Sequence, residues 1–323
     1  MHYLDRSFET GFKTKAFVRA LDVVRNTPPE EIEERATRNT LKQLDGIGDS
    51  SARVIVEALR GDMTYLDKLE SQTRVKITQA GQTYRDRLRG DCHLHSRWSD
   101  GGATISAMAT TAMELGHEYM VLTDHSPRLT IAHGLDRDRL LQQFDEIAAL
   151  NAEIAPFRIL TGMEVDILED GALDLDDDLL ERLDVVVASV HSKLRMDRFQ
   201  MTARMVRAVQ SPHVDILGHC TGRLIGKRPE SEFDAQKVFS SCAASHTAVE
   251  LNCRPERLDP PEKLLAIAVG AGCWFSIDSD AHATGQLEWQ PHGCDRAAAG
   301  HVPLDMVVNT LSAEDLVAWT NDR

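Results

Sequence analysis

The sequence predicts an α/β protein in two parts, a small all-helical domain followed by a closed barrel of parallel strands. From residue 91 onward, short apolar runs of β-type alternate with stretches of helical periodicity, which is the order of βα units in a parallel sheet. Residues 1 to about 70 carry helical periodicity alone. Because about seven βα repeats follow, a closed barrel is favoured over an open sheet, with its site at the carboxyl ends of the strands.

Length and composition are those of a globular protein with one large and one small domain. The chain has 323 residues, of which 42% are hydrophobic and 27% charged. It has no apolar run that could span a bilayer, and residues 1–5 lack the basic start and apolar core of a signal peptide. We therefore expect a cytoplasmic protein without a membrane partner. The six cysteines form no C-x-x-C pair, which predicts reduced, mostly buried thiols.

Charge is unevenly distributed along the chain. The net charge is −15, yet residues 1–90 hold 16 lysines and arginines against 14 aspartates and glutamates, whereas the remainder holds 20 against 37. An acidic body argues against a broad DNA-binding face and suits a site that concentrates cations. The near-neutral first part can still provide a small phosphate contact.

The helical domain is expected over residues 1–75. Apolar spacing predicts one helix over Lys13–Arg25, which ends at Pro28 and Pro29, and a second helix that begins at Glu30. A polar, basic linker is expected over residues 76–90, where arginines and lysines recur without apolar periodicity.

Within the helical domain, two glycines enclose one apolar residue at Gly46, Ile47 and Gly48, and Ala52 and Ile55 follow at helical spacing. This pattern is typical of a helix-hairpin-helix, whose backbone N–H groups at a helix N-terminus can bind a nucleic-acid phosphate. It equally fits a plain αα-hairpin, in which the glycines only permit the turn, or a protein docking module. DNA contact through these three residues is therefore one of the alternatives.

The barrel is expected over residues 91–323. Its predicted strands are Asp91–Leu94, Tyr119–Thr123, Arg158–Glu164, Asp184–Val190, Asp215–Gly218, Ala248–Asn252 and Trp274–Ile277. The predicted helices between them are Ile105–Leu115, Arg137–Ile154, Phe199–Val209, Asp234–Ser245 and Pro261–Ala271.

Histidine, aspartate or glutamate recurs at the carboxyl ends of the predicted strands. These residues are His93 and His95, Asp124 and His125, Glu164 and Asp166, His191, His219, and Asp280 and His282, with Asp100 in the turn after the first strand. One of them could be an ordinary core histidine, but a chance scatter of 13 histidines would not return repeatedly to this position. Because the carboxyl ends of parallel strands meet on one face of a barrel, the pattern predicts a metal site there.

The donor types narrow the chemistry of that site. His93 and His95 are two residues apart, so a strand would point both imidazoles to the same side. Nitrogen and oxygen donors without thiolate suit Zn, Mn or Fe, and the sequence does not choose among them. Divalent cations ~3.5–4 Å apart would lower the pKa of a bridging water, make hydroxide at neutral pH and bind phosphoryl oxygens.

These motifs resemble the PHP (polymerase and histidinol phosphatase) superfamily, most closely the PHP domain at the C-terminus of bacterial family X DNA polymerases. The matching stretches are Asp91–Gly101, Leu122–Ser126, Thr161–Leu173, Ala188–Ser192, Asp215–Arg223, Glu250–Asp259 and Ile277–His282. The helical part with Gly46 and Gly48 resembles the first helical part of the same polymerases. The fingers, palm and thumb that would hold the polymerase carboxylates are missing, so polymerase activity is not expected.

The resemblance implies a distorted (β/α)7 barrel that holds three divalent metal ions. Carried over by position, the ligand sets are His93, His95, Glu164 and Asp280; Glu164, His191 and His219, with Glu164 bridging; and Asp100, His125 and His282. All nine family ligands are present, so nothing in the set marks the site as inactive. Cys220 and Ser279 stand where proline and threonine are usual, and neither is a ligand; the shape of the pocket near Cys220 is the more doubtful point.

Neighbouring residues are candidates for supporting roles. Asp124 and Asp166, beside ligands, could orient the imidazoles, and Asp166 could equally cap the following turn. Arg223 is a candidate phosphate clamp, because guanidinium binds phosphate in a bidentate manner, with a salt bridge inside the barrel as the alternative. Lys193 is a second candidate, weighed against a solvated surface role.

Three further side chains stand in loops near the expected site. Arg254 and Arg257 could border the pocket, and His133, in the loop after His125, could touch substrate. The other histidines are interpreted as ordinary.

Three functions are compatible with this sequence. The first is a metal-dependent phosphoesterase on DNA ends, as a 3′-5′ exonuclease or 3′-phosphatase. The second is a small-molecule phosphatase of the histidinol-phosphatase type, favoured by the acidic body and the missing polymerase core. The third is a catalytically idle DNA- or protein-binding module, against which the complete ligand set argues.

Overall fold

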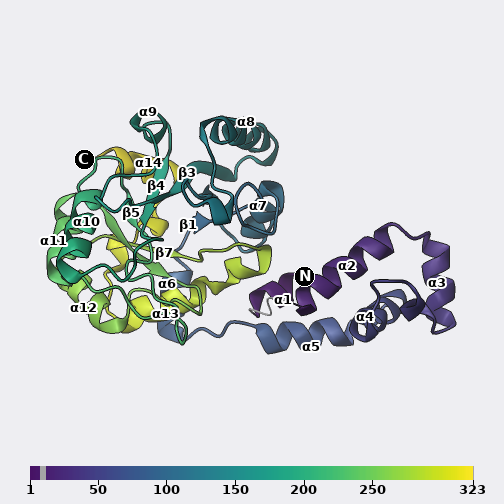
Figure 1. Cartoon of the computed structure of the whole chain (residues 1–323). Helices are drawn as coiled ribbons and strands as arrows, with labels where there is room; N and C mark the ends of the chain where they lie inside the picture. The colour runs from purple at the N-terminus through teal and green to yellow at the C-terminus, as the bar shows by residue number, and fades with distance from the viewer. Residues whose placement is uncertain (8–11, 323) are drawn as a thin grey trace. The chain divides into compact units, whose positions relative to one another are not determined.

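The computed structural model describes residues 1–7 and 12–322, which form two compact units, Met1–Arg74 and Val75–Arg323 (Figure 1). The first unit is all-helical. It contains α1 (His2–Arg6), α2 (Phe12–Arg25), α3 (Pro29–Thr37), the 3-10 helix η1 (Leu41–Gln43), α4 (Asp49–Leu59) and α5 (Thr64–Thr73). No helix in the described part of the chain is both long and apolar enough to cross a bilayer.

The core of the first unit is small. Ala20, Ile32, Leu41 and Ile47 are buried together, so Ile47 of the predicted hairpin points inward. Gly46 has a φ of +99° and a Cβ there would lie 2.9 Å from Arg19 Cγ, which explains why this turn needs glycine.

The second unit is a barrel of seven parallel strands in sequence order, which confirms the predicted fold class. The strands are β1 (Gly90–Leu94), β2 (Tyr119–Leu122), β3 (Arg158–Asp166), β4 (Val185–Ser189), β5 (Ile216–Leu217), β6 (Ala248–Asn252) and β7 (Phe275–Asp278). Leu94 bridges Ala281, and His95 N donates to Ala281 O at 2.8 Å, so the chain after β7 meets β1 and the barrel is nearly closed.

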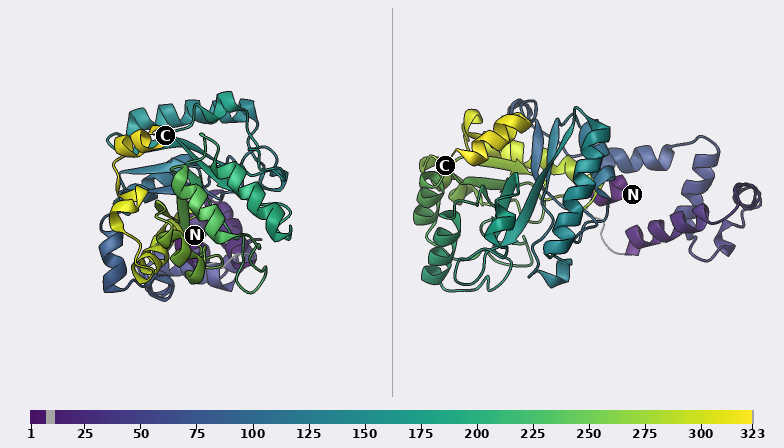
Figure 2. Two further views of the ribbon diagram at one scale, coloured as in Figure 1. Left: turned by 90° about the vertical axis from the view of Figure 1, so that its left-hand side faces the viewer. Right: turned by 90° about the horizontal axis from the view of Figure 1, so that it is seen from above.

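Helices surround the strands (Figure 2). They are α6 (Gln79–Arg85), α7 (Ile105–Glu114), α8 (Arg137–Ile154), α9 (Asp177–Leu180), α10 (Arg198–Val209), α11 (Ala235–Ala244), α12 (Glu262–Gly270), α13 (Gln290–Ala299) and α14 (Ala313–Asn321), with the 3-10 helices η2 (Thr130–Ala132), η3 (Thr284–Trp289), η4 (Leu304–Met306) and η5 (Val308–Thr310). Several begin where the sequence has an N-cap: Asp136, Asp197 and Asp234 accept backbone N–H groups of α8, α10 and α11.

Residues 76–90, which the sequence predicts as a linker, belong to the barrel unit instead. Thr78 caps α6 and its backbone N–H also donates to Asp295 Oδ1 of α13 at 2.9 Å. Tyr84 Oη donates to Val302 O at 2.6 Å. A Cβ at Gly81 would lie 2.0 Å from Asp295 Oδ1, so α6 packs closely on α13. Asp295 and Val302 lie more than two hundred residues away in sequence. Local periodicity cannot predict contacts over such a separation.

One apolar cluster joins the barrel strands to α14. Tyr119, Val121, Leu160 and Val187 are fully buried in one cluster with Trp319 of α14. All six cysteines are buried, as the sequence predicts for most of them.

Candidate metal centre

The carboxyl ends of the strands bring the nine predicted ligands together. His93 lies on β1 and His95 directly after it, Glu164 lies on β3, and His125, His191 and His219 follow β2, β4 and β5, while Asp280 and His282 follow β7. His93, His95, Glu164, His219 and Asp280 are at most 2% exposed, whereas the side chain of Asp100 is 35% exposed. The cluster therefore runs from a buried interior to an open edge at Asp100.

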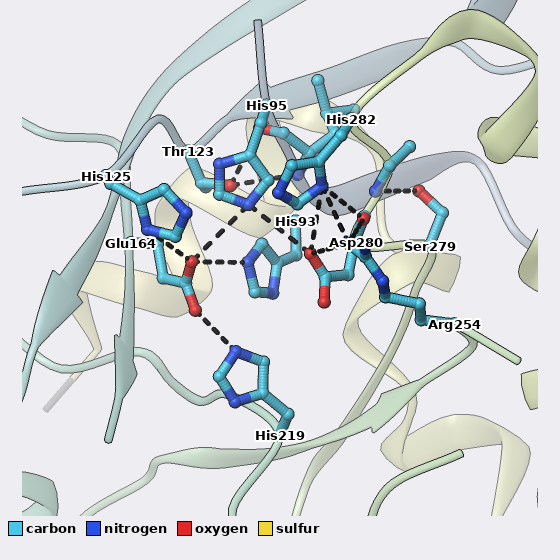
Figure 3. Close-up of polar contacts among 12 residues, drawn as sticks. His93, His95, Thr123, His125, Glu164, His219, Arg254, Ser279, Asp280 and His282 are labelled. Atoms are coloured by element: carbon cyan, nitrogen blue, oxygen red, sulfur yellow. Dashed lines mark hydrogen bonds and ion pairs between the residues drawn. The ribbon is translucent and has the colours of Figure 1, made fainter. Parts of the chain in front are cut away.

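Glu164 is the centre of the cluster (Figure 3). Its Oε1 lies 2.8 Å from His219 Nε2 and 3.2 Å from His191 Nε2. Its Oε2 lies 3.0 Å from His125 Nδ1, 3.3 Å from His93 Nε2 and 3.5 Å from His95 Nε2. Glu164 therefore brings together imidazoles from the ends of β1, β2, β4 and β5.

Two further groups extend the cluster. Asp280 Oδ1 lies 3.6 Å from His95 Nε2, and with His93 these residues form one candidate metal-binding group. Asp100 Oδ1 lies 3.5 Å from His125 Nε2 and 3.4 Å from His282 Nε2, which forms another. The groups overlap with the three ligand sets that the resemblance implies but differ in membership: His95 also lies in the group of Asp100, His125 and His282, and a third group joins His125, Glu164 and His191.

The unpaired polar atoms of the cluster fit metal ions. His93 Nε2, both ring nitrogens of His95, His125 Nδ1 and Glu164 Oε1 are buried and make no hydrogen bond within residues 1–7 and 12–322. Buried polar atoms without a hydrogen bond are costly and rare in proteins, so this concentration of donor and acceptor atoms fits the binding of metal ions. Nitrogen and oxygen donors of this kind bind divalent transition metals.

The electrostatics of the cluster favour cations. Burial alone would raise the pKa of Glu164, but the imidazoles of His93, His191 and His125 outweigh it and hold that pKa well below its usual range. Burial, with His282 and His125 nearby, lowers the pKa of His95 to about 3. Glu164 is therefore ionised and His95 neutral at pH 7, which are the forms that coordinate a metal ion. For His93 and His191 burial is outweighed by Glu164 and a second carboxylate, which raise the pKa of His93 well above its usual range and that of His191 to about 9, so a metal ion at these imidazoles would displace a proton.

Asp166 and Asp124 hold different parts of the site. Asp166 Oδ1 lies 3.4 Å from His191 Nδ1 and accepts the His191 backbone N–H at 3.1 Å, so it contacts a predicted ligand directly. Asp124 makes no hydrogen bond to an imidazole within the described residues. It accepts from Ser96 N at 2.8 Å, Ser99 Oγ at 2.5 Å and Gln143 Nε2 at 2.7 Å, and so fixes the loop that carries Asp100.

The two predicted phosphate-binding residues lie apart from the ligand cluster. Arg223 donates from Nε to Arg257 O at 2.7 Å and from Nη2 to Leu258 O, and forms an ion pair with Glu230 at 3.4 Å. Its guanidinium therefore fixes the loop after β6, in line with the alternative of a structural role. Lys193 is 64% exposed and its Nζ lies 3.8 Å from a carboxylate oxygen of Glu169.

Two other arginines face the cluster. Arg257 Nε lies 3.1 Å from Asp280 Oδ2, and Arg254 Nη1 lies 3.1 Å from His282 Nδ1. Both side chains are largely buried, at 14% and 17% exposed. His133, by contrast, is exposed in the loop after β2 and outside the cluster.

Sequence reasoning missed two residues of this site, Glu250 and Asn252 on β6. Glu250 Oε1 lies 2.6 Å from His93 Nδ1, and Asn252 Nδ2 donates to Asp280 Oδ2 at 3.1 Å. The sequence did contain a signal for them. Glu250 and Asn252 are polar residues two positions apart at the end of a predicted buried strand, so their side chains lie on the same face. Cys220, the doubtful position near the pocket, contacts Asp259 Oδ1 through Sγ at 3.4 Å.

Comparison with known proteins agrees with this geometry. The model of the PHP domain family matches residues 91–252. DNA polymerase/3′-5′ exonuclease PolX of Bacillus subtilis is 41% identical over 256 residues, which cover 79% of this chain and 43% of that protein. A probable phosphatase of Thermoanaerobacter sp. (strain X514) is 29% identical over 233 residues, which cover 68% of this chain and 89% of that protein.

Among solved structures, histidinol phosphate phosphatase from Lactococcus lactis aligns with a TM-score of 0.48 and 18% identity, over 65% of this chain and 94% of that one. The fold and the ligand cluster define a metal-dependent phosphoric ester hydrolase. The chain belongs to the PHP family. It spans less than half the length of the Bacillus relative.

Proposed function

We propose that this protein hydrolyses phosphate esters at DNA ends, as a 3′-5′ exonuclease or 3′-phosphatase, with three divalent ions bound in the cluster around Glu164. The observation that carries the proposal is the convergence of five imidazoles from the ends of β1, β2, β4 and β5 on the buried carboxylate of Glu164, with Asp100, Asp280 and His282 in adjoining groups. The similarity to a protein named as a DNA polymerase and 3′-5′ exonuclease supports DNA as the substrate class.

The ligand sets divide the cluster by depth. His93, His95 and Asp280 would hold one ion in the interior and His191 and His219 a second, and Glu164, which lies between the two groups, would contribute to both. Asp100, His125 and His282 would hold the third at the open edge, where a substrate arrives. When bound, Zn, Mn or Fe ions lower the pKa of water and neutralise phosphoryl oxygens.

The chain's own residues would bind the phosphate. Arg257 places a largely buried guanidinium beside Asp280, and its Nη1 is buried without a hydrogen-bond partner in the described part of the chain. A guanidinium with a free N–H group matches a phosphoryl oxygen. Arg223 supports this loop through the carbonyl of Arg257, so its effect on phosphate binding would be indirect. Lys193 remains a candidate for contact with a longer substrate.

The helical unit would contribute DNA binding through Gly46, Ile47 and Gly48. Gly48 is the N-cap of α4, and the first backbone N–H groups of a helix attract phosphate. A test is Gly48→Asp, which adds a negative charge at this N-terminus where a Cβ would meet nothing within 4 Å. Its charge control is Gly61→Asp, beyond the other end of α4, where a Cβ also meets nothing within 4 Å; because Gly61 has a φ of +69°, both variants are first checked for folding by circular dichroism.

Measured by fluorescence anisotropy with a labelled duplex, Gly48→Asp is expected to weaken DNA binding about tenfold, while Gly61→Asp stays near the unmodified protein. Binding should also weaken steeply as salt rises, because phosphate contacts release counterions. Equal affinity of the two variants would remove the hairpin from the proposal.

A small phosphomonoester is the second candidate substrate. The probable phosphatases align over 88–92% of their own length in several cases, whereas the Bacillus relative aligns over 43% of its length. The acidic barrel is also unfavourable for a long polyanion.

One experiment separates these functions. Mn-loaded protein is given a 3′-recessed DNA duplex and, separately, histidinol phosphate, with His191→Ala and a chelator-treated sample as controls. We expect DNA degradation that is lost in both controls. Phosphate release from histidinol phosphate alone would favour the small-molecule phosphatase, and activity on neither substrate with metal bound would contradict both and favour an idle binding module.

A further inference from the structure

Strand β6 is the strand whose end carries no predicted metal ligand, yet it delivers two polar side chains to the cluster. Glu250 and Asn252 are two residues apart, so they lie on the same face of the strand, and both are 0% exposed. A carboxylate buried this completely is expected to have specific partners. Those partners are the metal ligands themselves.

Glu250 contacts ligands from two different metal sets. Its Oε1 lies 2.6 Å from His93 Nδ1, and its Oε2 accepts the backbone N–H of His219 at 2.5 Å. The first contact acts on the orientation of the imidazole ring. The second fixes the backbone of β5 at the point where His219 leaves the strand. A single side chain thus links the ligand at the end of β1 to the ligand at the end of β5.

Asn252 extends this link to a third ligand. Its Nδ2 donates to Glu250 Oε2 at 3.2 Å and to Asp280 Oδ2 at 3.1 Å, while its Oδ1 accepts the Arg254 backbone N–H at 3.2 Å. The reverse orientation of the amide would place its oxygen against two carboxylates and its NH2 against an N–H donor. The observed orientation is therefore the one that satisfies all three neighbours.

We propose that Glu250 is a positioning residue of the metal centre, which acts together with Asn252 and contributes no metal ligand of its own. A neutral imidazole has one N–H group, and a carboxylate at Nδ1 holds that hydrogen there, which leaves the Nε2 lone pair free. His93 Nε2 faces Glu164 Oε2 at 3.3 Å. The inference rests on the proposed assignment of His93 and His219 as metal ligands.

The stereochemistry of Glu250→Gln makes the proposal testable. If the amide oxygen stays on His93, its NH2 group meets two N–H donors, those of His219 and Asn252. If the NH2 group faces His93 instead, the imidazole must accept at Nδ1 and carry its hydrogen on Nε2, which blocks coordination. Both arrangements oppose metal binding, although glutamine has nearly the same side-chain volume as glutamate. Glu262→Gln, at an exposed glutamate in the first turn of α12, is the matched control.

The measurement is metal binding itself, read from Co2+ titration by absorption spectroscopy and from metal content after dialysis. We expect Glu250→Gln to bind at least one ion about 10–100-fold more weakly, with an altered Co2+ spectrum. Asn252→Ala, which keeps both other Glu250 contacts, is expected to show a smaller loss. Glu262→Gln should match the unmodified protein. Unchanged affinity and spectrum in Glu250→Gln, with the fold confirmed by circular dichroism, would overturn the proposal.

Two controls keep the result interpretable. If metal-free Glu250→Gln does not fold, Glu250→Asp replaces it; the shorter carboxylate cannot reach both His93 and His219, so intermediate affinity is expected and full affinity would overturn the proposal. If the unmodified protein binds no divalent ion, the proposed function itself fails. If it binds and turns over substrate while Glu250→Gln behaves identically, only the positioning role fails.

Discussion

His117, outside the metal centre, makes the stability of the barrel depend on pH. It follows α7 and precedes β2, is 5% exposed, and neither ring nitrogen has a hydrogen-bond partner in the described part of the chain. Burial, together with the charge of Arg85, lowers the pKa of His117 from 6.5 to about 3. Below pH 6.5 the unfolded chain therefore binds a proton that the folded chain does not bind. Stability is complete above that pH and falls as the pH falls toward 3.

The magnitude follows from the two pKa values. Each pH unit between them costs about 1.4 kcal/mol, so lowering the pH from about 7.5 to about 5 removes about 2 kcal/mol through this one group. Replacement of His117 by leucine removes the titrating group and leaves no new unpaired polar atom. At pH 7.5 the variant should be as stable as the original protein or more stable. At pH 5 it should be more stable by about 2 kcal/mol beyond any difference at pH 7.5.

Urea unfolding in excess chelator measures this difference. The residues of the metal centre also titrate as the pH falls, but their effect on stability is the same in both proteins and cancels in the comparison. Tryptophan fluorescence reports on the barrel unit alone, since Trp98, Trp274, Trp289 and Trp319 all lie in Val75–Arg323. His301→Asn, at an exposed histidine with a φ of +54°, is the control for loss of one imidazole. An identical pH dependence in His117→Leu and the original protein would refute the reasoning.

Three further predictions concern packing. Gly81→Ala places a Cβ 2.0 Å from Asp295 Oδ1. It should lower the free energy of unfolding of the barrel, measured in urea, by about 1–3 kcal/mol. Unchanged stability would show that α6 does not pack as described. Gly270→Ala, where a Cβ meets nothing within 4 Å, should instead stabilise by about 0.4–1 kcal/mol, and a loss would contradict the free space. Thr221→Val removes the hydroxyl donor to the buried Asp259 carboxylate and should cost about 1–3 kcal/mol; a neutral effect would mean that the carboxylate finds another partner.

Local sequence determined the strands and the places of the ligands. The strand predicted over Ala248–Asn252 has those bounds in the structure, and the helix predicted over Arg137–Ile154 is α8. Both depend on periodicity and caps within a few residues. The candidate ligands followed from one further rule, that parallel strands joined by helices put all their carboxyl ends on one face, and their division into three sets came from the family resemblance. Residues as distant as His93 and His282 could therefore be assigned to one site without contact information.

Tertiary structure decided what each supporting side chain does. Arg223 holds the carbonyl of Arg257, whereas Arg257 itself faces Asp280; the sequence predicted a phosphate clamp at Arg223 and a place at the border of the pocket for Arg257. Glu250 contacts His93 across 157 positions. Periodicity specifies which face a side chain occupies, but not which partner from another strand lies opposite it. That partner depends on strand register and loop path, which are fixed only when the barrel closes.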